Sequence, residues 1–263
     1  MVAMPKRLWL VGAVAGVVSG MLGVGGGLVI GPALILLGMP LRRAAGTALA
    51  LIPFIAAAAV IAEVLLEPQN IYPGLASAVF LGGIVGVKLG AIIDKAISSS
   101  LLHHLFLLLL VVAAARNIYA GLAPPSLALA PQLVELYAQY YFYAAIFGVF
   151  AGVCAALFGV GGGVVVVPAL IIAVDGISFQ AASAISLLAM VPTAAMAVRN
   201  AYKQQRIDVV LAKSLAIVCL PAAVVGVALR NYSLDHSQLQ LCFAVFLIYV
   251  AFRILRRGPT PGT

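Results

Sequence analysis

The sequence predicts an all-α polytopic membrane protein made of two inverted repeats, each with five segments. Three observations predict this fold class. Of the 263 residues, 65% are hydrophobic and 8% are charged, apolar runs recur along the whole chain, and both halves carry the same glycine motif. Because a soluble domain has roughly 25% charged residues, we expect the lipid bilayer to surround most of this chain.

The internal repeat consists of the motif GVGGG followed four residues later by PAL. Residues 20–35 read GMLGVGGGLVIGPALI, and residues 155–171 read AALFGVGGGVVVVPALI. An offset of 136 residues pairs Gly23 with Gly159. Repeats of half the protein's length are typical of secondary transporters, whose halves are commonly inserted in opposite directions.

Each half contains five apolar segments, separated by polar, proline or glycine breaks. They cover 7–23, 28–38, 44–66, 74–94 and 101–120 in the first half, and 137–158, 164–174, 180–200, 209–230 and 237–255 in the second. An odd number of segments turns the second copy upside down relative to the first. The chain then divides into a first membrane repeat at 1–121, a Pro-rich linker at 122–136 and a second membrane repeat at 137–263.

The basic residues predict the orientation in the membrane. The net charge is +8, but the charges lie between the apolar runs and form no patch, so nucleic acid is not an expected partner. With both termini cytoplasmic, twelve of the 15 Lys and Arg residues fall on the cytoplasmic side: Lys6, Arg7, Arg42, Arg43, Lys95, Arg199, Lys203, Arg206, Lys213, Arg253, Arg256 and Arg257. Since Lys and Arg concentrate in cytoplasmic loops, we expect a multi-pass cell-membrane protein with both termini inside.

The second segment of each half is too short to cross a bilayer. It has eleven residues, or about 16 Å of helix, which is half the hydrocarbon thickness. We therefore expect each GVGGG to form a short broken helix or a re-entrant hairpin. Two full crossings would distribute the charges in the same way, so spanning and re-entry both stay open.

The hairpins predict a site for an anion. The N-termini of the short helices would bring free N–H groups and positive dipole ends to the middle of the membrane. The residues expected to line the turns are Gly25, Gly26, Gly27, Gly161, Gly162 and Gly163. Such a site needs no charged side chain. Close helix packing is the alternative role for these glycines, but three in succession would weaken a helix by roughly 1 kcal/mol each.

Four further side chains are candidates for binding the substrate. Thr47, Ser183 and Ser186 open the third segment of each half and can donate hydrogen bonds to an oxyanion. A hydroxyl that bonds to its own helix carbonyl is the alternative. Lys88 is the only charged residue well inside a predicted span, which makes it a functional candidate, although its side chain can also extend to the interface.

Catalytic motifs are missing from the sequence. It contains neither HExxH nor GxSxG, so we expect no enzyme and no cofactor. The cysteines Cys154, Cys219 and Cys242 lie in apolar runs without CxxC spacing, which indicates no zinc site and no disulfide framework.

At the paired GVGGG and PAL motifs, and at AAGTALAL and AASAISLL after them, the sequence resembles the sulfite exporter TauE/SafE family. The resemblance covers almost the whole chain. It implies a permease of the cytoplasmic membrane for small sulfur-containing anions such as sulfite, sulfoacetate or related organosulfonates. Ser186 stands near where the first copy carries Ala48, so the site need not be symmetric.

The expected partners are a small anionic substrate and the lipid bilayer. A coupling ion, H⁺ or Na⁺, and a second copy of the chain in a homodimer are also open. A passive anion channel, or a carrier of a small carboxylate without sulfur, is the alternative function. The sequence leaves the substrate, the direction of transport and the driving force undecided.

Overall fold

The computed structural model describes residues 6–256 except 97, 123–137, 175 and 234. These residues form ten α-helices and one short 3₁₀ helix, with no β-strand in the described ranges. The predicted linker at 122–136 lies outside the described residues, apart from Leu122. The all-α class is therefore confirmed.

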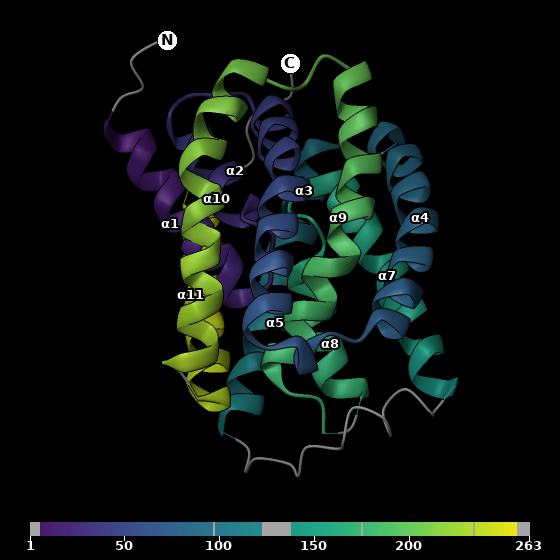
Figure 1. Cartoon of the computed structure of the whole chain (residues 1–263). Coiled ribbons are helices and arrows are strands. Elements are labelled where there is room, and N and C mark those ends of the chain that lie inside the picture. The colour runs from purple at the N-terminus through teal and green to yellow at the C-terminus, as the bar shows by residue number, and fades with distance from the viewer. Residues whose placement is uncertain (1–5, 97, 123–137, 175, 234, 257–263) are drawn as a thin grey trace.

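The ten helices follow the ten predicted apolar segments, with ends that differ by at most three residues. The first half contains α1 (Lys6–Leu22), α2 (Gly27–Leu36), α3 (Leu41–Leu66), η1 (Pro68–Asn70), α4 (Pro73–Ala96) and α5 (Ser99–Leu122). The second half contains α7 (Ala138–Phe158), α8 (Gly163–Ala173), α9 (Phe179–Lys203), α10 (Val209–Tyr232) and α11 (His236–Leu255). Figure 1 shows the long helices side by side in one bundle.

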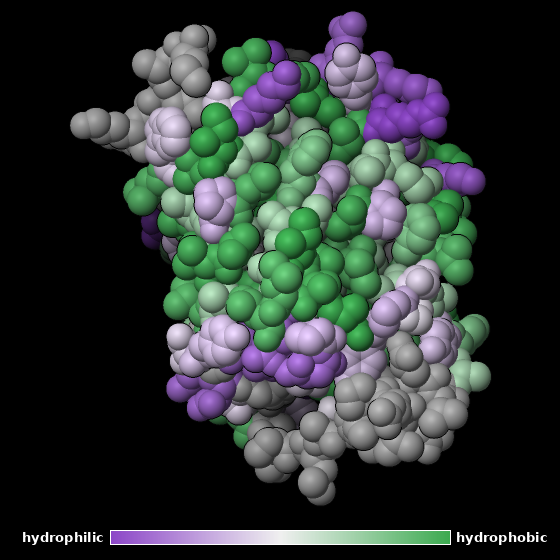
Figure 2. Space-filling view, in the orientation of Figure 1, coloured by the Kyte–Doolittle hydropathy of each residue, from purple (hydrophilic) through white to green (hydrophobic). Residues whose placement is uncertain are grey.

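Five of the described helices are long and apolar enough to cross a membrane: Arg42–Leu66, Pro73–Asp94, Ala138–Phe158, Phe179–Lys203 and Val209–Tyr232. Large apolar side chains such as Phe54, Leu81 and Val245 are exposed. In Figure 2 hydrophobic side chains cover the middle of the visible face, and hydrophilic side chains gather toward its two ends. This distribution suits a protein surrounded by lipid, so the chain is a multi-pass membrane protein.

Glycine contacts join the two halves along parallel helices. On α1 and α10, Gly12 meets Leu215, Gly16 meets Ala222 and Gly20 meets Val227. On α4 and α7, Gly82 meets Ala145, Gly86 meets Val149 and Gly90 meets Ala156. Because the residue numbers rise together, α1 runs parallel to α10 and α4 runs parallel to α7. Small residues allow the backbones to approach this closely.

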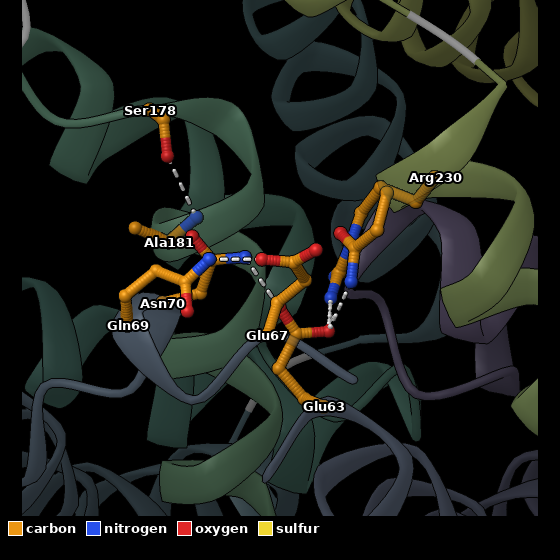
Figure 3. Close-up of polar contacts among 8 residues, drawn as sticks. Glu63, Glu67, Gln69, Asn70, Ser178, Ala181 and Arg230 are labelled. Carbon is orange, nitrogen blue, oxygen red and sulfur yellow. Dashed lines mark hydrogen bonds and ion pairs between the residues drawn. The ribbon is translucent and has the colours of Figure 1, made fainter. Parts of the chain in front are cut away.

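The central helices α3 and α9 run in opposite directions. Leu49 lies near Ala197 on one cavity wall. The short helix η1, which follows the end of α3, contacts α9, and Figure 3 shows Asn70 of η1 beside Ala181 near the start of α9. Helix α10 is parallel to α3, because Asp208 contacts Thr47 near their starts and Arg230 contacts Glu63 near their ends.

These directions define two ends of the bundle. We call the end where α4 and α9 finish the Asp94 end, which lies at the top of Figure 1. The opposite end, where α3 and α10 finish, is the Glu63 end.

Candidate functional site

The two glycine turns have the same backbone conformation. The first, third and fourth residues of each GVGGG adopt positive φ: Gly23 (71°), Gly25 (70°), Gly26 (73°), Gly159 (67°), Gly161 (81°) and Gly162 (83°). Glycine adopts this region readily, whereas other residues do so at a cost. The turns therefore require glycine at these positions, and each turn leads directly into a short helix, α2 or α8.

The turns also touch each other. A Cβ atom on Gly27 would lie 2.4 Å from the carbonyl oxygen of Gly159, and one on Gly163 would lie 2.3 Å from that of Gly23. Neither distance leaves room for a side chain. The structure thus brings the two predicted glycine sets, one from each half of the chain, into direct contact.

Backbone N–H groups are left without partners at this contact. The triplets Gly25 to Gly27 and Gly161 to Gly163 are buried. In the described part of the chain their N–H groups donate no hydrogen bond, and neither α2 nor α8 has a side-chain cap. Buried N–H groups without acceptors are rare and costly, while helix N-termini with free N–H groups bind anions. Six such groups on two touching turns therefore suit a negatively charged ligand.

Two apolar side chains from the central helices lie between the turns. Ile52 of α3 and Met190 of α9 each approach both Gly25 and Gly161, at 2.8 to 3.0 Å from a Cβ built on either glycine. Both side chains are buried. Neither residue is among the candidates predicted from the sequence. A signal was nevertheless available, because they stand one and two residues before the prolines of the third segments, Pro53 and Pro192.

The two predicted serines of α9 lie against the first turn. Ser183 packs on Gly23, and its buried Oγ has no hydrogen-bond partner among the residues that the structure describes. The Ser186 Oγ donates to the Gly23 carbonyl oxygen at 3.0 Å. One hydroxyl thus fixes the turn, and the other is free to donate to a ligand.

Thr47 and Lys88 are placed away from the turns. The Thr47 Oγ1 accepts from the backbone N–H of Asp208 at 3.0 Å, which ties α3 to the start of α10 at the Asp94 end. Lys88 is exposed on α4, beside the exposed apolar residue Leu89. The structure therefore groups eight of the ten predicted site residues and separates these two from them.

A small cavity lies beside the second turn. It has a volume of about 10 Å³, and its lining includes Gly83, Gly161, Ser186, Met190 and Thr193. This is space for about one water molecule. Thr193, which the sequence analysis missed, donates from Oγ1 to the Ala189 carbonyl oxygen at 2.7 Å and brings a third hydroxyl to the region. An anion can enter only if side chains such as Met190 move.

The described residues contain no group of three or more His, Cys, Asp or Glu side chains able to hold a metal ion. The long apolar helices define a multi-pass membrane protein.

The chain belongs to the sulfite exporter TauE/SafE family, whose model matches residues 2–117 and 144–263. Each matched part contains one of the two glycine motifs. The family resemblance predicted from the sequence is therefore confirmed, and with it the membrane permease class. A search of curated proteins finds no match to this chain.

Proposed function

We propose that the protein is a secondary transporter that binds a small anion between its two glycine turns. The observation that carries the proposal is that the N–H groups of the buried residues Gly25 to Gly27 and Gly161 to Gly163 donate no hydrogen bond within the described residues. Gly26 and Gly162 are the N-cap residues of the two short helices, and Gly27 and Gly163 are their first residues. At these positions the helix dipole favours negative charge. The free hydroxyl of Ser183 adds a donor at the same place.

The two halves are, in this proposal, inverted copies whose turns meet near the bilayer midplane. Support comes from the helix directions, since α1 is parallel to α10 and to α3, whereas α7 is parallel to α4 and to α9. Because α3 and α9 are antiparallel, α1 and α7 point in opposite directions. The helices α2 and α8 have 10 and 11 residues, which is about half the length needed to cross the membrane. In this proposal each forms a re-entrant hairpin with the helix before its glycine turn.

The Asp94 end faces the cytoplasm in this proposal, together with both termini. Basic residues are concentrated there: Arg42, Arg43, Arg199, Lys203, Arg206 and Lys213 lie at the starts of α3 and α10 or at the end of α9. The Glu63 end has Arg230, which is paired with Glu63. Positive residues are retained on the cytoplasmic side of membrane proteins.

Sulfite or an organosulfonate is the proposed substrate. The family description supports sulfite, and a small oxyanion needs the least movement of side chains such as Met190 to enter beside the second turn. N–H donors bind the oxygen atoms of such anions without a formal positive charge, so the ligand can leave again on the other side. A proton or sodium gradient would drive the transport.

Flux into liposomes tests this function. Purified protein is assayed with sulfite, sulfoacetate, thiosulfate and acetate, each with and without a proton or sodium gradient. We expect saturable sulfite flux that follows one gradient and is lost in Gly26→Val and Gly162→Val, whose folding is checked by thermal melting. Flux that rises linearly with concentration and ignores both gradients would identify a channel, and selective acetate flux would identify a carboxylate carrier.

A further inference from the structure

Two ion pairs lie at opposite ends of the molecule. At the Glu63 end, Arg230 of α10 donates to Glu63 of α3, and both side chains are 0% exposed. At the Asp94 end, the Arg206 Nη1 donates to the Asp94 Oδ2 at 2.9 Å, and the two side chains are 27% and 9% exposed. A cation and a carboxylate thus join neighbouring helices at each end of the bundle.

The two pairs occupy equivalent positions in the two halves. Gly152 of α7 packs against the carbonyl oxygen of Gly83 on α4. In the same way, Gly16 of α1 packs against the carbonyl oxygen of Cys219 on α10. Asp94 follows Gly83 by eleven residues, and Arg230 follows Cys219 by eleven residues. The same place on α4 and α10 therefore carries opposite charges. Glu63 of α3 pairs with Arg230, and Arg206 from the loop between α9 and α10 pairs with Asp94.

At the Glu63 end, several donor side chains surround the Glu63 carboxylate (Figure 3). Besides Arg230, the Glu63 carboxylate accepts from the Asn70 Nδ2 at 2.7 Å and from the Asn231 Nδ2 at 3.1 Å. The buried Nη1 of Arg230 finds no acceptor within the described ranges. The Arg230 guanidinium and the amides of Asn70 and Asn231 together offer the N–H donors that bind the oxygen atoms of a small anion.

The Glu63 pair is aligned with the glycine turns along α3. Ile52, Ile55, Ala59 and Glu63 are all fully buried and follow one another at helical spacing, so they share one face of the helix. Ile52 touches both turns. The face thus leads from the turns to the Glu63 carboxylate.

The Asp94 pair lies near the far end of a buried face of α9 that begins at the glycine turns. Met190 touches both turns, and Thr193 and Ala197 follow it on one buried face. Ala197 then lines a second cavity of about 30 Å³, whose wall also contains Asp94 and Arg206. This cavity has room for about two water molecules, and both members of the ion pair line it.

We propose that Arg230 and Arg206 are the anion-receiving residues at the two ends of the transport path, and that Glu63 and Asp94 occupy them while no anion is present. A small oxyanion takes the place of the carboxylate on the arginine, which separates the helices that the pair joins. Each pair is thus a binding site and a gate. The inference rests on the proposed function, because it assumes that the anion travels between the ends through the turns.

A purely structural role explains these pairs less well. Replacing a buried ion pair by apolar residues is often neutral or stabilising, so stability alone gives no reason for a fully buried arginine. The arrangement also leaves one Arg230 donor unused in the described residues. An incoming oxyanion would satisfy it.

Paired substitutions test the gates without leaving an orphan charge. Glu63→Gln with Arg230→Gln removes one pair, and Asp94→Asn with Arg206→Gln removes the other. Arg43→Gln with Asp208→Asn is the matched control, because Arg43 and Asp208 form an ion pair at the Asp94 end whose side chains are 55% and 30% exposed. All variants are compared with the wild type by thermal melting and by flux in liposomes, with the anion that the wild type carries best.

Loss of a charge-assisted contact should raise the KM for the anion by about ten-fold or more in both gate variants, and the control should keep the wild-type KM. Arg230→Lys in the presence of Glu63 keeps the charge without the planar donor group, so its KM should fall between those of the wild type and the double variant. Wild-type KM values in both gate variants would overturn the inference.

Labelling reports gate opening independently of flux. Cysteines are introduced at Ala59 and at Ala197 and are exposed to a membrane-impermeant maleimide, with the native cysteines as a constant background. With the pairs intact, sulfite should increase the labelling, and removal of the pair at the same end should make labelling fast without sulfite. Slow labelling in the gate variants would contradict the inference. Wild-type protein that transports no anion of the panel would refute the proposed function instead.

Discussion

Replacement of Gly27 by alanine should force the two glycine turns apart. The new Cβ would lie 2.4 Å from the Gly159 carbonyl oxygen and 2.9 Å from the Ile52 Cδ1. Ordinary van der Waals contact begins at 3.4 Å, so the turns must separate by about 1 Å. Overpacking of this kind costs about 1–3 kcal/mol. Gly27 has a helical φ, so the substitution changes the contact and leaves the preferred backbone conformation available.

Gly31→Ala is the matched control. It lies in the same short helix, but its Cβ would meet only the Ala48 Cβ at 4.0 Å. Alanine in a helix interior is favoured over glycine by about 1 kcal/mol. We expect Gly31→Ala to melt at the wild-type temperature or above and to keep full flux.

Thermal melting in detergent and anion flux in liposomes measure both variants. If the separation of the turns costs the same 1–3 kcal/mol in anion binding, the affinity for the anion falls by about 5- to 150-fold. Gly27→Ala should therefore melt at a lower temperature and require a higher anion concentration for half-maximal flux. Gly163→Ala should behave alike, because its Cβ would lie 2.3 Å from the Gly23 carbonyl oxygen. Wild-type melting and flux in both variants would refute the contact between the turns.

Three other substitutions separate the roles of neighbouring side chains. Ser183→Ala removes a buried hydroxyl that has no partner in the described structure. The melting temperature should be unchanged or higher, while the KM for the anion should rise. A lower melting temperature with an unchanged KM would count against a ligand-facing hydroxyl. Met190→Ala enlarges the cavity beside the second turn and should cost about 2–5 kcal/mol of stability. The larger cavity should admit larger sulfonates, and their competition with labelled sulfite for transport would detect this. Lys88→Gln changes an exposed side chain and should leave the KM unaltered in the same flux assay; a large increase would show that Lys88 acts on the substrate.

The sequence predicted the helices well because local rules determine them, whereas re-entry of the chain at each GVGGG stays a prediction. Apolar runs bounded by breaks located all ten described helices. The repeated GVGGG marked the positions with positive φ, since only glycine adopts that conformation without strain. Ser183 and Ser186 became candidates because they open a segment directly after a turn, and their role in binding stays a prediction.

The remaining contacts depend on tertiary packing between helices that are apolar on every side. Periodicity did not show that Ile52 and Met190 face the turns, because lipid-facing and buried positions of such helices carry the same residue types. Glu63 and Arg230 stand near the ends of the predicted segments 44–66 and 209–230, yet they are 167 residues apart in the sequence and form a buried pair. Thr47 was predicted to bind the substrate, but its hydroxyl accepts from the N–H of Asp208 and lies away from the turns.

The location of the bound anion tests the central claim most directly. The full-length protein would be crystallised in lipid with selenite, the heavier analogue of sulfite, and its anomalous scattering would locate the selenium atom. The proposed site predicts one peak within hydrogen-bond distance of the N–H groups of Gly26 and Gly162, flanked by Ile52 and Met190. Selenium found only at the aqueous ends of the bundle, with the two turns unchanged and still in contact, would contradict it.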